Sequence, residues 1–280
     1  MTTSPPDFSQ ASWRLKLVRA EHHFEELERT IRAYSDTRPY RAERVLDSQA
    51  DRDVWRFRLV MPEKPDPQIA IILGDVVHNI RSALDHLAVA LAPPNRKKSA
   101  GFPIENFDFW AKDGRTYRRR DRGAIQSRTA FRRRTRGMHR RAQAFIKALQ
   151  PYRQPDPKDN SLYLINRFEN ADKHRELISA NFGLHDVIVS AYIGRPGNGA
   201  RLPERNYGFC ENGAKLFETT PPDGFTLDSE VHVEVAGAPA ITFDLGFAGE
   251  STDIIETLRE LLKNVRMYIL PVLEPLIPPE

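Results

Sequence analysis

Cysteine is almost absent from this 280-residue sequence, and its scarcity excludes several classes of protein. The single cysteine, Cys210, permits neither a disulfide framework nor a zinc site built from several cysteines. No apolar run approaches the roughly 20 residues of a membrane span, and the N-terminal segment lacks the basic-then-apolar pattern of a secretory signal. The sequence therefore predicts a cytoplasmic protein without a membrane partner.

Several common functional motifs are missing as well. Neither Gly-x-Gly-x-x-Gly nor Gly-x4-Gly-Lys-Ser/Thr occurs, which disfavours two frequent kinds of nucleotide site. The His-Glu-x-x-His signature of zinc hydrolases and the Gly-x-Ser-x-Gly elbow of serine hydrolases are also absent. Any chemistry must therefore come from other residues.

The charge of the chain is distributed very unevenly. With 42 Lys and Arg against 38 Asp and Glu, the formal net charge is only +4. The stretch from Arg115 to Arg141, however, contains twelve arginines and one acid, Asp121, so it carries +11 and the rest of the chain −7. Such a distribution excludes a uniformly basic, histone-like protein and favours one local segment that binds anions.

We define residues 112–141 as the basic arm and interpret it as the contact for RNA or another polyanion. Tyr117 and Phe131 lie among the arginines, where aromatic rings are able to stack on bases. A flexible solvated insert and a contact for an acidic partner are the alternatives. The candidate nucleic-acid-binding residues are Arg115, Arg118, Arg119, Arg120, Arg132, Arg133, Arg134, Arg136, Arg140 and Arg141.

Hydrophobic periodicity predicts one mostly α (α+β) domain over residues 1–280. The pattern indicates five core helices, over 12–34, 68–92, 137–150, 160–180 and 252–270, with Pro271 ending the last. A β-hairpin is expected over 41–61, and a β-rich portion over 181–250, between the fourth and fifth helices. Residues 95–136 show no regular pattern.

The helix over 68–92 has an unusual polar face. Its core face is conventional, but Asp75, Asn79, Ser82 and His86 gather on the other side, flanked by His78, Arg81 and Asp85. Asn, Asp and Ser are mediocre helix formers, so helix stability does not explain this composition. The face predicts either a cleft able to transfer protons or a buried polar network that holds helices together.

A second polar cluster follows on the helix over 160–180. A solvated helix end and a second wall of the same cleft are both consistent with its composition. The residues interpreted as supporting the cleft are Asp75, His78, Asn170, Asp172, Lys173, His174 and Arg175.

Two resemblances bear on these clusters. The runs Asp75–His86, Gly101–Ile104, Gln150–Tyr152 and Asn170–Arg175 together resemble a recurring group of bacterial proteins, a resemblance that implies no activity. Arg81-Ser-Ala-Leu-Asp-His86 is similar to the Arg–(four to six residues)–His motif of the HEPN superfamily, whose members are helical bundles. Many of these are metal-independent endoribonucleases of bacterial toxin or phage-defence systems. Ser82 departs from the Asn, Asp or His that often follows the arginine there.

The HEPN resemblance implies a homodimer with a HEPN-like bundle that cleaves RNA without a cofactor. Arg81 would then hold the phosphate and His86 would act as acid and base, with Asp85, Ser82 and Asn79 beside them. Two alternatives stay open. One is a non-catalytic protein that binds nucleic acid or protein, and the other is a metal-dependent hydrolase with Asp75, His78, His86 and His174 as ligands.

Overall fold

The computed structural model describes most of the chain, which divides into two compact units where the sequence predicted a single domain. The helical unit comprises Met1–Leu27, Ile71–Ile178 and Ile255–Glu280, and the sheet unit comprises Glu28–Ala70 and Ser179–Ile254. The described residues are 7–37, 40–45, 54–61, 66–105, 122–157, 160–173, 180–194, 200–226, 228–243 and 254–279, with side chains except at 122–127, 169–173, 180–182, 239–243 and 254.

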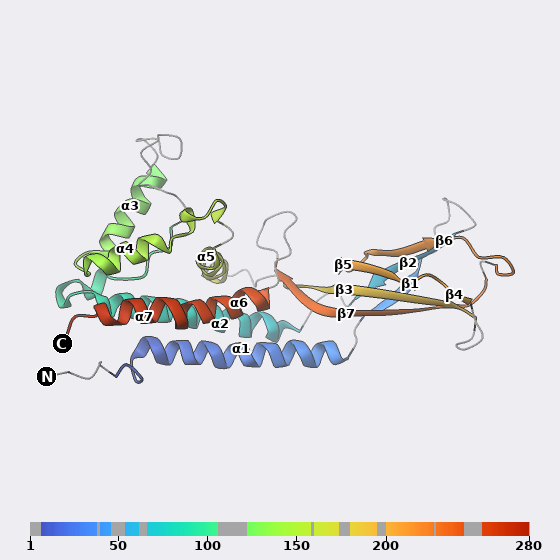
Figure 1. Cartoon of the computed structure of the whole chain (residues 1–280), viewed down its shortest axis with the longest axis horizontal. Helices are drawn as coiled ribbons and strands as arrows, with labels where there is room; N and C mark the ends of the chain where they lie inside the picture. The colour runs from blue at the N-terminus through green and yellow to red at the C-terminus, as the bar shows by residue number, and fades with distance from the viewer. Residues whose placement is uncertain are drawn as a thin grey trace. The chain divides into compact units, whose positions relative to one another are not determined.

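The secondary structure is mixed α and β, which confirms the α+β class (Figure 1). The α-helices are α1 (Ser12–Asp36), α2 (Pro67–Leu91), α3 (Arg122–Thr135), α4 (Arg140–Ala148), α5 (Ser161–Lys173), α6 (Ile254–Asn264) and α7 (Leu270–Leu273). The 3-10 helices are Pro94–Ser99, Pro151–Arg153 and Glu274–Leu276. Within the described ranges, no helix is both long and apolar enough to cross a bilayer.

The apolar stripes of the two long helices are buried as the sequence predicted. In both helices the stripe recurs at steps of three and four residues, which places its members on one side of the helix. The buried members are Trp13, Leu17, Ala20, Phe24, Leu27 and Ile31 on α1, and Val76, Val77, Ile80, Ala83, Leu84, Leu87 and Leu91 on α2.

The basic arm differs from its expected irregular structure, because its second half forms α3. Phe131 is only 4% exposed, Thr135 is 2% exposed, and the Thr135 hydroxyl donates to the Phe131 carbonyl. Met138, one turn further on, is also buried. Phe131 therefore packs inside the helical unit, and the prediction that it stacks on bases is wrong.

The C-terminal helix continues past Pro271, where the sequence predicted its end. Residues Val265–Ile269 form a π-turn, in which the Leu270 N–H donates to the Val265 carbonyl five residues earlier. Proline has no N–H to donate four residues back, and a wider turn just before it relieves the clash with the preceding carbonyl. The helix then adds another turn as α7 and brings Glu274 to its end.

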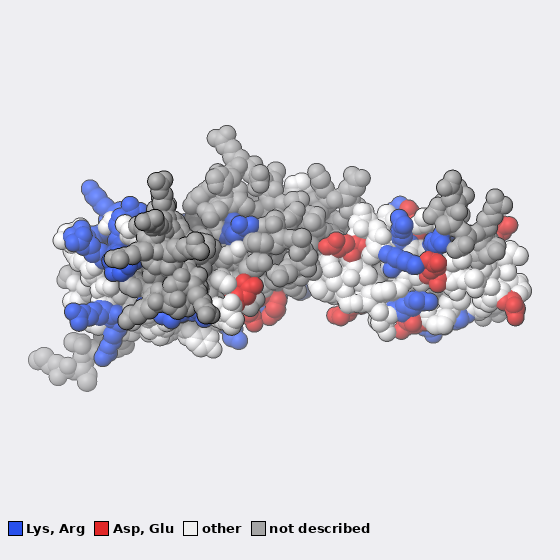
Figure 2. Space-filling view, turned by 90° about the horizontal axis from the view of Figure 1, so that it is seen from above, with Lys and Arg blue, Asp and Glu red and all other residues white. Residues whose placement is uncertain are grey.

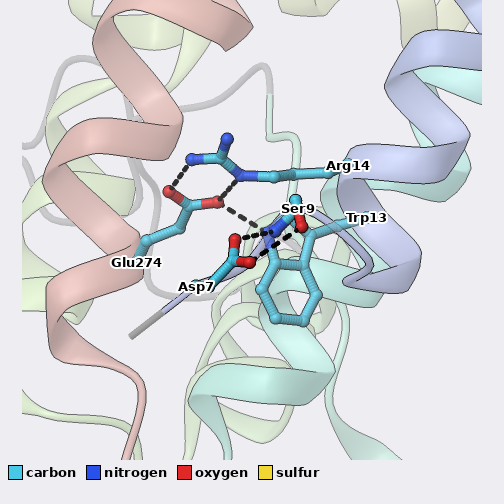
Figure 3. A network of polar contacts seen from close by, with 5 residues as sticks. All are labelled: Asp7, Ser9, Trp13, Arg14 and Glu274. Atoms are coloured by element: carbon cyan, nitrogen blue, oxygen red, sulfur yellow. Dashed lines mark hydrogen bonds and ion pairs between the residues drawn. The ribbon is translucent and has the colours of Figure 1, made fainter. Parts of the chain in front are cut away.

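Glu274 joins the first helix to the last (Figure 3). Its buried carboxylate accepts hydrogen bonds from the Trp13 indole at 2.9 Å and from Nε and Nη2 of Arg14 at 2.6 Å each. The bond to Glu274 raises the pKa of the Arg14 guanidinium. Ahead of α1, the Ser9 N–H and hydroxyl donate to Asp7 and lower the pKa of that carboxyl.

The sheet unit contains two small antiparallel sheets. In the first sheet, β1 (Arg41–Arg44) pairs with β2 (Trp55–Val60), which confirms the hairpin, and β2 also pairs with β6 (Lys215–Thr219). In the second sheet, β3 (Ala180–Ile193) pairs with β4 (Ala200–Arg201), β5 (Arg205–Glu211) and β7 (Val231–Phe243). The hairpin and the β-rich portion therefore belong to one unit.

Apolar side chains hold the two sheets together. A small cavity lined by Val189 and Ala191 of β3 and Phe217 of β6 lies between them, and Trp55 of β2 is fully buried. Cys210 of β5 is buried too, and this burial raises the pKa of its thiol.

The pairing of β3 with β7 contains a bulge. Between His185 and Ile188 the register with β7 shifts, and Asp186 takes a positive φ of 50°. Because the bulge absorbs the register shift, β7 runs unbroken through Gly237.

We predict that Gly183→Ala destabilises the sheet unit. A Cβ at this position would lie 2.4 Å from the Phe209 ring across the β3–β5 pair, and overpacking of this kind costs about 1–3 kcal/mol. Gly208→Ala is the matched control, since an added Cβ there meets nothing within 4 Å. Urea denaturation measures both; equal stability of the two variants would contradict the packing at Gly183.

We predict that Glu274→Ala lowers the free energy of unfolding by about 2–3 kcal/mol, because it leaves the buried Trp13 N–H without its acceptor. Arg14→Ala is expected to cost about 1 kcal/mol, since this side chain is 43% exposed. The exposed pair Arg266–Glu21 provides the control, and Arg266→Ala is expected to change stability by less than about 1 kcal/mol. A Glu274→Ala effect no larger than the control would contradict the assigned role.

Candidate functional site

Arg81, the proposed phosphate-binding residue, lies buried in a set of internal hydrogen bonds. Its guanidinium Nη2 donates to the Phe102 carbonyl at 2.8 Å and to Asp85 Oδ1 at 3.2 Å, and its Nε lies 3.2 Å from Asp85 Oδ2. The Phe102 N–H donates to Asp85 Oδ1 at 2.8 Å. The Arg81 side chain is only 8% exposed, and its described partners are all groups of the protein.

The segment that Arg81 and Asp85 hold, residues 101–105, is anchored at its other end by Gln150. The Gln150 amide accepts from the Glu105 N–H at 2.9 Å, and it donates to the carbonyls of Pro103 and Ile146. Phe102 and Gln150 are both fully buried. These hydrogen bonds, which we name the 101–105 clamp, join α2 to the end of α4. They form a buried polar network, one of the two interpretations of the polar face of α2.

The other polar residues of α2 differ in exposure. Asn79 is buried, and its amide donates back to the Asp75 carbonyl four residues earlier. Asp75 and His78 are exposed, whereas Ser82 and His86 are half-buried. The cavities formed by described residues are lined by other residues.

The second polar cluster lies mostly outside the described part of the chain. Asn170, Asp172 and Lys173 belong to α5, but their side chains are not described, and His174 and Arg175 lie beyond it. Among the described residues, no group of three or more His, Cys, Asp and Glu side chains is placed to hold a metal ion.

The described part of the basic arm presents its arginines on the surface of α3 and α4. Arg115, Arg118, Arg119 and Arg120 lie outside the described residues. Arg134 is half-buried and turns toward the clamp, because a Cβ on Gly101 would lie 3.9 Å from Arg134 Cδ and 3.4 Å from Asp85 Oδ1. The exposed arginines are Arg132, Arg133, Arg136, Arg140 and Arg141.

These arginines surround a cavity of about 720 Å³, which we name the basic cavity. Five cationic residues line it, from the 3-10 helix 94–99, from α3 and the turn after it, and from α4, and none of its described lining residues is acidic. Neutral polar groups are contributed by Ser99, Thr129 and Gln143. In Figure 2, Lys and Arg side chains gather at the α3–α4 end of the helical unit. The five cationic residues are Arg96, Arg132, Arg133, Arg136 and Lys147.

Close packing fixes the shape of the basic cavity. Gly137, between α3 and α4, has a φ of 85°, and a Cβ there would lie 2.8 Å from Pro93 Cγ. Only glycine permits this approach at this backbone conformation. The Gln143 amide donates to the Met138 carbonyl, which orients its side chain beside the cavity. The cationic residues of 94–99 and of α3–α4 are thereby held around the basic cavity.

Arg96 and Lys147 are not among the binding residues that the sequence predicted. Arg96 stands in a visible basic run, Arg96-Lys97-Lys98, but this run is separated from the basic arm in sequence. The close approach of Pro93 and Gly137 that unites them is a tertiary contact, which periodicity does not reveal.

Comparison of the chain with protein-family models, with curated proteins and with solved structures gives no match.

We predict that Arg81→Ala destabilises the protein by about 2–3 kcal/mol, because it removes the donor that the buried Phe102 carbonyl and Asp85 share. His86→Ala, at a half-buried position without a described hydrogen bond, is expected to cost less than about 1 kcal/mol. Denaturant unfolding of both variants tests the clamp. If Arg81→Ala is as stable as wild type, the stabilising role assigned to Arg81 is contradicted and the arginine becomes a candidate for phosphate binding again.

Proposed function

We propose that the protein binds RNA without cleaving it, through a basic surface on its helical unit. We define this basic surface as the exposed or half-exposed cationic residues of 94–99 and of α3–α4. A single observation supports the proposal: residues 94–99 and 122–148 contain twelve lysines and arginines and no acid, and the structure folds the two segments against each other. We keep the HEPN-like fold as part of this proposal, supported by the Arg81–His86 spacing in the second half of α2.

The charge of this surface suits the phosphate backbone. Neutralising several phosphates releases counterions from the nucleic acid, which gives affinity without sequence preference and a steep dependence on salt. Arginine grips a phosphate with two parallel hydrogen bonds, and arginines outnumber lysines on α3 and α4. RNA or a similar linear polyanion is therefore the partner that this charge favours.

The environment of Arg81 supports binding rather than cleavage. An arginine that binds a phosphate needs donors that point at the ligand, and the described donors of Arg81 point at Asp85 and the Phe102 carbonyl. Redirecting the guanidinium toward a phosphate would leave the buried Phe102 carbonyl without its hydrogen bond. Within this proposal, Arg81 stabilises the fold and does not bind the phosphate.

We predict that Arg140→Ala/Arg141→Ala weakens binding of a single-stranded RNA about tenfold at low salt, as does Lys97→Ala/Lys98→Ala. Each lost phosphate contact is also expected to reduce the slope of log affinity against log salt by about 0.7. Fluorescence anisotropy over a salt series measures both quantities.

The matched control is Arg201→Ala/Arg205→Ala, which removes the same charge from exposed positions of the sheet unit. Affinity unchanged by all three double variants would refute the assigned surface. The same samples, incubated in EDTA, test catalysis. RNA cleavage by wild type that disappears in His86→Ala would overturn the non-catalytic assignment.

A further inference from the structure

We propose that the basic cavity, which lies within the basic surface, is also a binding site for a compact oligophosphate. The ligand class is a short chain of phosphate groups, either inorganic or carried by a nucleotide. Three features of the described residues support this assignment: the number and origin of the cations, the volume that they surround, and the rigidity of their framework.

The cationic side chains converge on one hollow from separate directions. Arg96 comes from the 3-10 helix after α2, Arg133 from the end of α3, Arg136 from the turn that follows α3, and Lys147 from α4. An extended nucleic acid, by contrast, is able to contact cations that are spread along a helix surface. Arg140 and Arg141 provide such positions outside the cavity. Cations gathered around one hollow match a ligand whose charges are themselves gathered in a small volume.

The volume of the basic cavity fits such a ligand. At about 720 Å³ it falls within the range of small-molecule sites, about 300–1,000 Å³. Several positive charges in that volume call for an anion of several charges, and guanidinium groups bind phosphate oxygens in pairs. Thr129, Ser99 and Gln143 add neutral hydrogen-bonding groups at the same wall, suited to phosphate oxygens or to a nucleoside.

The framework prevents the cations from moving apart. The Gly137–Pro93 contact, the buried Thr135 hydroxyl bonded to the Phe131 carbonyl and the Gln143–Met138 hydrogen bond fix the turn between α3 and α4. Arg133 and Arg136 are therefore held near Arg96 despite their like charge, which costs stability when no anion is bound. A bound oligophosphate relieves this repulsion and stabilises the fold through linkage.

The test compares inorganic triphosphate, ATP and sulfate at equal ionic strength, by isothermal titration calorimetry and thermal unfolding in 0.15 M salt. We expect wild type to bind triphosphate at least about tenfold more tightly than sulfate, and saturating triphosphate to raise Tm by on the order of 5 °C. Tighter binding of ATP than of triphosphate identifies a nucleotide as the ligand, and equal or weaker binding identifies the phosphate chain alone. Equal affinity for sulfate and triphosphate overturns the proposal.

The variant Arg133→Gln/Arg136→Gln is expected to lose triphosphate binding by about tenfold or more. Without ligand, its Tm is expected to equal or exceed that of wild type. Arg140→Gln/Arg141→Gln removes the same charge next to the cavity and is expected to bind triphosphate within about threefold of wild type. Equal losses in the two variants overturn the proposal, because they would indicate general charge attraction.

If Arg133→Gln/Arg136→Gln does not fold, as judged by circular dichroism, Ala144→Glu places a carboxylate at the exposed wall of the cavity and is expected to abolish triphosphate binding. Unimpaired binding by that variant contradicts the proposal. The RNA titrations stand apart from this result: RNA binding without selective triphosphate binding sustains the proposed function alone, and the reverse sustains this inference alone.

Discussion

The hydrogen bonds that hold residues 101–105 are the constraint on which the rest of the helical unit depends. Arg81 and Asp85 of α2 fix the backbone of Phe102, and Gln150 fixes Pro103 and Glu105. Every one of these bonds joins buried or half-buried groups. Removing one partner therefore leaves the other without a hydrogen bond in the protein interior, which costs stability. The short 3-10 helix Pro94–Ser99 lies between α2 and this clamp, so the clamp also determines where Arg96 lies.

The basic surface follows from that placement. α3 and α4 are joined at Gly137, whose approach to Pro93 sets the two basic segments beside each other. Like charges at such density oppose folding, and the buried side chains of Phe131 and Thr135 offset that repulsion by anchoring α3. The half of the basic arm within α3 is therefore a structural element as well as part of the proposed binding surface, whereas its sequence shows no regular pattern.

The fold was predictable where one face of an element is apolar. The stripes of α1 and α2 and the 41–61 hairpin follow from local periodicity. The pairing of β2 with β6, the unbroken β7 and the helix past Pro271 depend on distant partners or on a local bulge or π-turn, which no local pattern encodes. At the site, the four-residue spacing of Arg81 and Asp85 indicates an ion pair, but their bonds to Phe102 arise only in the tertiary structure.

Hydrogen exchange with and without a single-stranded RNA tests most directly whether the basic surface, rather than the polar face of α2, contacts the nucleic acid. We predict that RNA slows amide exchange in residues 94–99 and 129–147, and leaves exchange in residues 75–86 of α2 unchanged. Slowed exchange centred on Arg81 and His86, with residues 129–147 unaffected, would contradict it and would return function to the helix that carries the Arg–His motif.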